Sequence, residues 1–142
     1  TQGLGVALQE VAISTQTLSG IPCTFEGDEA LPVVPGTVAA QLYRITQEAA
    51  HNAARHAQPQ RIEIRLAAVA GKLLLTVRDD GIGYPEDASS GAGMGHHVMP
   101  YRARLIGADF SIRSLPGGGT LVSCSLPLKQ AALFSSSSKD ST

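Results

Sequence analysis

The chain has 142 residues, of which 43% are hydrophobic and 16% are charged, and its formal net charge is -1. This length and composition suit one soluble globular domain. The charge disfavours a nucleic-acid surface, because such surfaces need clustered Lys and Arg. There is neither an apolar run of the roughly 18 residues that span a membrane nor a signal-peptide pattern. We therefore expect a cytoplasmic protein, with any membrane anchor outside this chain.

Apolar periodicity predicts three helices and five strands in a fixed order. Expected are a helix over 3–18, a strand over 21–25, a helix over 37–57, strands over 61–66 and 72–77, a helix over about 96–106, and strands over 110–114 and 120–126. Strands joined by short turns indicate a mostly antiparallel sheet whose apolar face the helices must cover. The predicted fold is α+β, a two-layer α/β sandwich. Residues 1–128 would form the domain and the Ser-rich residues 129–142 a disordered tail.

Two local features bear on this outline. Cys23 and Cys124 lie in alternating apolar runs and match no metal-ligand spacing, so we expect buried free thiols in a reducing compartment. Pro100 falls near the start of the third helix. Because proline disrupts a helix beyond its first turn, that helix could begin as late as Met99.

Four polar residues share one side of the helix over 37–57. Glu48, Asn52, Arg55 and His56 lie within roughly a quarter of its circumference, at about 100° per residue. Oxygen ligands beside nitrogen donors fit a metal-phosphate site. An ordinary solvated helix face is the alternative.

Two glycine-rich segments lie between the predicted strand over 72–77 and the predicted third helix. Asp79, Gly81 and Gly83 follow a strand directly, where a carboxylate can accept a hydrogen bond from an exocyclic amine and glycines allow a flat ring to approach. Residues 91–95 include Gly93, Met94 and Gly95 and lead into the helix, where backbone N–H groups can bind an anion. A tight turn and a flexible linker are the respective alternatives.

In combination, these segments resemble the conserved boxes of histidine kinases. Residues 47–57 are similar to the N box, residues 79–83 to the G1 box, and residues 93–95 with Met99 and Arg102 to the G2 box. Residues 117–120 and the strand after them resemble the closing motif of the family. The resemblance covers about residues 4–127 and implies the ATPase fold shared with type II topoisomerases, Hsp90 chaperones and mismatch-repair ATPases. Residues 42–57 look most like the subfamily related to nitrate and desaturase sensor kinases.

The resemblance implies that the chain binds ATP and Mg²⁺. Asn52 would hold Mg²⁺, with Glu48 as a second ligand or as the base acting on the attacking histidine. Asp79 would bind the adenine amine, with Thr120 nearby. The remaining residues implied in ATP binding are Arg55 and His56 at the phosphates, and Gly81, Gly83, Gly93, Met94 and Gly95 in the ATP lid. His96 and Pro100 depart from the family pattern, in which an aliphatic and a charged residue are usual.

The resemblance also implies a phosphoacceptor histidine, followed by an acidic residue, on a dimerisation domain of the same protein, and relay of phosphate to a response regulator. None of the four histidines, His51, His56, His96 and His97, precedes an acidic residue. We therefore expect the acceptor upstream of residue 1 and expect this fragment to be a monomer. Two other functions stay open, an anti-sigma-factor-type serine kinase of the same fold and a non-catalytic nucleotide-binding module.

Overall fold

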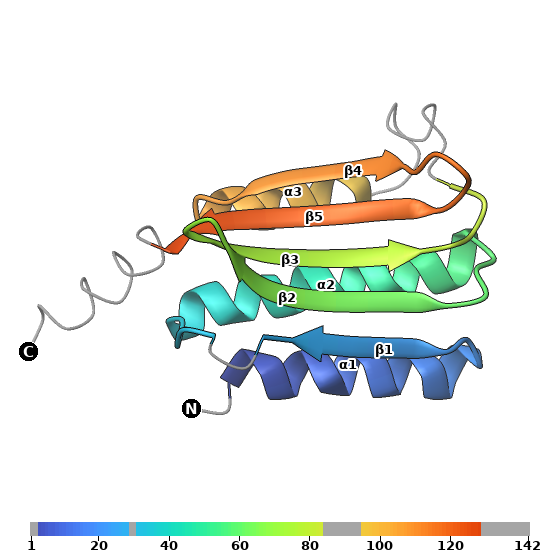
Figure 1. Cartoon of the computed structure of the whole chain (residues 1–142), viewed down its shortest axis with the longest axis horizontal. Coiled ribbons are helices and arrows are strands. Elements are labelled where there is room, and N and C mark those ends of the chain that lie inside the picture. Colours follow the sequence, from blue (N-terminus) through green and yellow to red (C-terminus); the bar gives the residue numbers. More distant parts are fainter. Residues whose placement is uncertain (1–2, 29–30, 84–94, 129–142) are drawn as a thin grey trace, which may run out of the picture.

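The computed structural model describes residues 3–28, 31–83 and 95–128, with residues 95–97 described by their backbone alone (Figure 1). Within these residues lie three helices and five strands, close to the predicted boundaries. In chain order they are α1 (Gly3–Ser19), β1 (Cys23–Gly27), α2 (Gly36–His56), β2 (Ile62–Val69), β3 (Lys72–Asp79), α3 (Gly95–Leu105), β4 (Asp109–Ser114) and β5 (Thr120–Pro127). The predicted tail over 129–142 lies outside the described residues.

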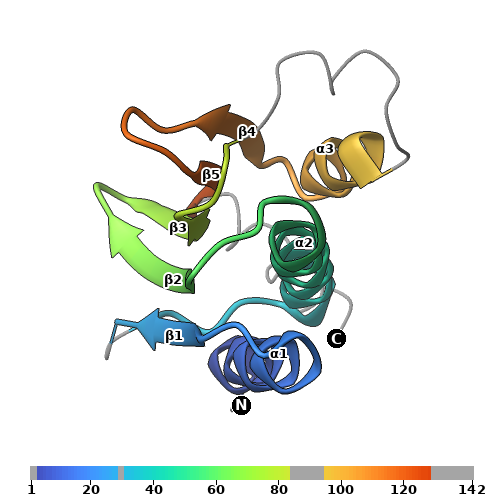
Figure 2. The same cartoon turned by 90° about the vertical axis from the view of Figure 1, so that its right-hand side faces the viewer.

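The described strands form one mixed sheet in the order β1-β2-β3-β5-β4. β1 pairs with β2 in parallel, and the other three pairings are antiparallel. The parallel pair follows from the α2 crossover between β1 and β2, because a parallel connection must return the chain to the same end of the sheet. Figure 2 shows the helices on one side of the sheet, with α2 between α1 and α3. The predicted two-layer α+β fold is confirmed.

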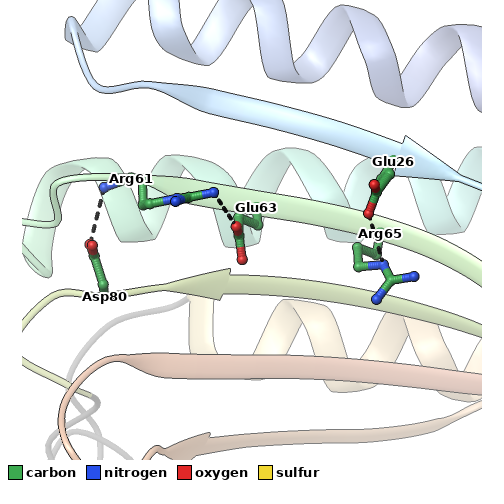
Figure 3. Close-up of polar contacts among 5 residues, drawn as sticks. All are labelled: Glu26, Arg61, Glu63, Arg65 and Asp80. Carbon is green, nitrogen blue, oxygen red and sulfur yellow. Dashed lines mark hydrogen bonds and ion pairs between the residues drawn. The ribbon is translucent and has the colours of Figure 1, made fainter.

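The core lies between these two layers. On β3 and β5, and on β2 as far as Leu66, every second residue is buried, because successive side chains of a strand point to opposite faces of a sheet. Examples are Ile62, Leu75 and Cys124, which belong to the same buried hydrophobic cluster as Ile45 of α2. The opposite face of the sheet carries charged pairs such as Arg65–Glu26 (3.5 Å) and Arg61–Glu63 (Figure 3). This division explains the alternating apolar and polar sequence of the strands.

The third helix begins one residue before the predicted start at about residue 96, and the alternative start near Met99 is wrong. α3 begins at Gly95 and contains Pro100 in its interior. The first four N–H groups of a helix have no partner within it, but Pro100 is the sixth residue of α3. Proline at this position therefore costs the helix one backbone hydrogen bond. The burial of Met99 and Ala103 offsets that loss, because both are almost inaccessible to solvent. In the described part of the chain, no helix has the length and apolar character needed to cross a bilayer.

Candidate functional site

The candidate site is built around the carboxyl end of β3. Asp79 is the last residue of β3 and pairs in register with Thr120, the first residue of β5. Asp79 is 5% exposed and Thr120 is 8% exposed. A buried carboxylate is uncommon, because removing its charge from water costs free energy unless a partner compensates for it. The structure thus brings together two predicted site residues that lie far apart in the chain.

The surroundings of the Asp79 carboxylate shift its pKa in opposite directions. Burial raises its pKa above the ordinary value of 3.8, and the neighbouring Asp80 charge raises it further. The N–H of Gly81 donates to Asp79 Oδ1 at 2.8 Å, and this bond, with a second from the Thr120 backbone, lowers the pKa in part. Among the described residues two backbone N–H groups bond to the charged form, which leaves Asp79 with capacity to accept a hydrogen bond from a ligand.

Two glycines allow the backbone to fold tightly around Asp79. A Cβ on Gly81 would lie 2.1 Å from the carbonyl oxygen of Ala57, and a Cβ on Gly119 would lie 2.1 Å from that of Asp79. Gly119 also has φ +101, a conformation that favours glycine. The close approach of Gly81 to Ala57 brings the loop after β3 against the end of α2. The sequence predicted that Gly81 is a site residue in a glycine-rich segment after a strand, but it did not indicate its contact with Ala57.

The loop after β3 is also bonded to the end of α2 through its backbone. The N–H of Ile82 donates to the carbonyl oxygen of Ala57 at 2.8 Å. Gly83 lies farther on, with φ +93, and a Cβ there would lie 3.2 Å from Ser114 Oγ of β4. The predicted G1 segment therefore crosses from the end of α2 towards the end of β4.

The predicted polar stripe of α2 is divided between two environments. Glu48 and Asn52 are half-buried, whereas Arg55 and His56 are exposed. Glu48 and Arg55 line a groove of about 690 Å³ between α2 and α1, and Asn52 and His56 lie outside its lining. Arg55 Nη1 lies 3.5 Å from His51 Nε2. The structure thus places Glu48 and Asn52 next to one another on the helix and turns Arg55 towards the groove.

The glycine-rich segment before α3 is described only in part. Gly93 and Met94 lie outside the described residues, as do the side chains of His96 and His97, and Gly95 begins α3. α3 is joined to α2 by Arg102, whose Nη1 donates to Gln41 Oε1 at 3.1 Å. This contact was not predicted; a long cation and an acceptor on separate helices give no local signal in the sequence.

The described residues contain no ready-made cluster of three or more His, Cys, Asp or Glu side chains that could hold a metal ion. The α2 donor set, one carboxylate and one carboxamide four residues apart, nevertheless fits Mg²⁺. This ion takes oxygen ligands and usually relies on one or two protein groups, with waters and substrate phosphates completing its shell. Within the described part of the chain, no hydrogen bond or ion pair occupies the side chain of Glu48 or Asn52. The pair is therefore chemically suited to a shared metal-phosphate complex.

Comparison with known proteins gives the family. Residues 37–130 match the model of the histidine kinase-, DNA gyrase B- and HSP90-like ATPases. Over 129 residues the chain is 33% identical to the sensor protein VraS of Staphylococcus saprophyticus, covering 91% of this chain and 37% of that protein. It is 37% identical over 97 residues to VraS of Staphylococcus aureus, and covers 28% of that relative. The chain thus spans well under half of the curated relatives it matches.

Solved structures agree with this assignment. The histidine kinase domain of the blue-light-activated kinase EL346 from Erythrobacter litoralis superposes with a TM-score of 0.78 at 27% identity, covering 91% of this chain and 63% of that one. The ATP-binding domain of PrrB from Mycobacterium tuberculosis shares the fold, with a TM-score of 0.72 at 18% identity and coverage of 88% and 93%. The chain belongs to the histidine kinase-, DNA gyrase B- and HSP90-like ATPase family, as a homologue of its histidine kinase members.

Proposed function

We propose that this domain binds ATP with Mg²⁺ and donates the γ-phosphoryl group to a histidine on a separate phosphoacceptor domain of the same protein. The observation that carries the proposal is the buried Asp79, paired with Thr120 and enclosed by the loop that is bonded to α2. A structural neighbour, ShkA, was solved in complex with AMPPNP, and its TM-score of 0.73 supports a like use of the fold.

At the base end, Asp79 would accept a hydrogen bond from the exocyclic amine of adenine. Its Oδ1 already accepts from Gly81, so the ionised group has free lone pairs for a ligand donor. A base without that amine would leave a buried carboxylate unsatisfied, and this gives a physical reason for selecting adenine. Thr120 would line the same pocket. Gly81 and Gly83 would let the loop pass close to the ring, since neither carries a side chain.

At the phosphate end, Asn52 and Glu48 would hold Mg²⁺, and Arg55 or His56 would reach the phosphates. Bound Mg²⁺ would neutralise charge that develops on the transferred group. Phosphoryl transfer depends mainly on positioning and charge neutralisation, so few protein groups suffice. Alternatively, Glu48 would not bind the metal but would act as the base on the acceptor imidazole. Gly93, Met94 and Gly95 would complete the site as its lid.

The proposal extends to the longer protein. An acceptor histidine on a dimerisation domain would pass the phosphoryl group to a response regulator in the cytoplasm, as expected of a relative of sensor proteins such as VraS. Residues 1–128 would form the ATP-binding domain, and the isolated domain would be a monomer. The domain would also belong to the subfamily related to nitrate and desaturase sensor kinases, a proposal supported by the resemblance of residues 42–57 and of residues 20–25.

Calorimetric titration with ATP in Mg²⁺, and again in EDTA, tests the binding step. Asn52→Ala should weaken ATP binding in Mg²⁺ and change it little in EDTA, because its amide serves the metal. Gln47→Ala is the matched control: this exposed residue of the same helix bonds only to Tyr43, with Nε2 3.0 Å from the hydroxyl, among the described residues. Unchanged affinity of Asn52→Ala in Mg²⁺ contradicts its role.

Incubation with γ-labelled ATP tests the transfer step. The chain alone should stay unlabelled, and adding the phosphoacceptor domain of its own longer protein should give an acid-labile phosphohistidine on that domain. Stoichiometric label on His51, His56, His96 or His97 would overturn the assignment of a separate acceptor. Acid-stable label on a serine of a partner would instead indicate the serine-kinase function.

A further inference from the structure

The residue after Asp79 carries an exposed carboxylate that bonds to backbone rather than to solvent alone. Asp80 Oδ1 accepts from the N–H of Gln60 at 2.8 Å. It also accepts from the N–H of Arg61 at 3.0 Å, a bond shown in Figure 3. The guanidinium of Arg61 points away and bonds to Glu63 instead. Asp80 is therefore a clamp on the backbone of the segment before β2, and not a partner in a surface salt bridge.

The clamped segment joins α2 to β2. Ala57 caps the carboxyl end of α2, Pro59 is buried, and Ile62 pairs in register with Asp79. Two residues beyond Asp80 in the same loop, the N–H of Ile82 donates to the carbonyl oxygen of Ala57 at 2.8 Å. The connection after α2 is thus held at two points by the loop that follows Asp79, through the side chain of Asp80 and through the backbone of Ile82.

This arrangement links the two ends of the proposed nucleotide site. Asn52 lies five residues before Ala57, or about 8 Å along the helix axis at about 1.5 Å per residue. The segment that Asp80 holds directly follows the end of α2 that contains Asn52, the proposed metal ligand. The residue before Asp80 in the chain is Asp79, the proposed base-binding carboxylate. A shift of the segment against β3 would change the distance between these two groups.

We infer that Asp80 is a positioning residue, which sets the base-binding Asp79 against the metal-binding end of α2 through two hydrogen bonds to the 57–61 connection. The inference rests on the proposed function for the roles of Asp79 and Asn52. The clamp itself rests on the contacts above. Asp80 is suited to the task because the hydrogen bond from Arg61 lowers its pKa, so the group stays ionised and its hydrogen bonds are charge-assisted.

Three variants test the inference. Asp80→Ala removes the acceptor, and Asp80→Asn keeps an Oδ1 acceptor without the charge. Asp28→Ala is the matched control, because Asp28 is also an exposed carboxylate that accepts a backbone N–H of the β2 region, from Ala68 at 2.9 Å. Ala68 lies six residues beyond Ile62, at about 20 Å along the strand. The control therefore removes a similar bond far from the candidate site.

The readout is the ratio of the dissociation constants for ITP and ATP, in Mg²⁺, together with amide hydrogen exchange at Gly81. ITP lacks the exocyclic amine, so a structural loss that merely destabilises the fold lowers both affinities alike, whereas a misplaced Asp79 lowers the ratio. In Asp80→Ala we expect the ratio to fall by about fivefold to tenfold, as for one hydrogen bond, and the Gly81 N–H to exchange faster. Asp80→Asn should recover most of the ratio, and Asp28→Ala should match the wild type.

An unchanged ratio in Asp80→Ala, or an equal fall in Asp28→Ala, overturns the inference. If Asp80→Asn is as impaired as Asp80→Ala, charge rather than position is responsible, and the inference is again wrong. Failure of the wild-type chain to bind ATP overturns the proposed function separately. Exchange at Gly81 needs no nucleotide, so unchanged exchange in Asp80→Ala still refutes the clamp in that case.

Discussion

Asp79→Asn should weaken ATP binding without lowering the free energy of unfolding. The reason is that the buried carboxylate is proposed to bind the ligand, whereas its burial opposes folding. Asparagine has nearly the same shape and can keep an Oδ1 acceptor for the Gly81 N–H, which lies 2.8 Å away. The substitution removes the charge and replaces one acceptor by an NH₂ donor. In the proposed complex this donor would face the amine of adenine, so two donors would oppose one another.

The loss of binding can be estimated from this change. A hydrogen bond to a charged group contributes about 1.5–3 kcal/mol, which corresponds to a loss of roughly 10-fold to 150-fold in ATP affinity. The upper part of this range is expected, because Asp79 is only 5% exposed and an unsatisfied donor there gains little from water.

The effect on stability has the opposite sign. The pKa of Asp79 in the folded chain is raised above its ordinary value of 3.8, chiefly by burial. The protonated form is therefore favoured by folding: its contribution to stability is fully present below pH 3.8 and is lost as the pH rises through the raised folded pKa. At pH 7 the ionised group opposes folding, and asparagine carries no such charge. The free energy of unfolding of Asp79→Asn at pH 7 should equal or exceed that of the wild type, and this advantage should vanish at about pH 3.

Calorimetric ATP titration and urea unfolding at both pH values check the two halves of the prediction. Asp109→Asn is a suitable control, since this exposed carboxylate lies at the start of β4, at the opposite end of that strand from Ser114, which pairs with Thr120. Affinity of Asp79→Asn within about twofold of the wild type would refute the base-binding role. A lower free energy of unfolding at pH 7 would show that the carboxylate is structural.

Three further predictions concern the fold around the site. Gly81→Ala should lower the free energy of unfolding by about 1–3 kcal/mol in urea titrations, because its Cβ would meet a backbone carbonyl, whereas Gly5→Ala in an open part of α1 should raise it by about 0.5–1 kcal/mol. Both thiols should resist a disulfide reagent at pH 8 until the chain unfolds, since burial raises the pKa of Cys124 to about 12 and that of Cys23 to about 11. Ile45→Ala should cost about 2–5 kcal/mol by thermal or urea unfolding, because Ile45 is fully buried at the centre of α2.

Much of the fold could be predicted from local sequence pattern. α2 is recognisable because its buried residues recur at helical spacing on one face, and β2 and β3 because burial alternates along each strand. These periods arise directly from the geometry of a single element, so no knowledge of its neighbours is needed. The start of α3 was less predictable, since the cost of Pro100 within the helix is outweighed by the burial of Met99 in the tertiary structure.

The candidate site divides in the same way. The sequence by itself determined which residue types stand on one side of α2 and which follow β3, because spacing within one element settles their relation. The family resemblance implied that Thr120 lies near Asp79, but only the tertiary structure decided the register of β3 and β5 that pairs them. It alone also decided that Asp80 bonds to the connection after α2. The first contact depends on strand register and the second on the path of a connection. Each joins residues far apart in the chain, so neither produces a periodic pattern in the sequence.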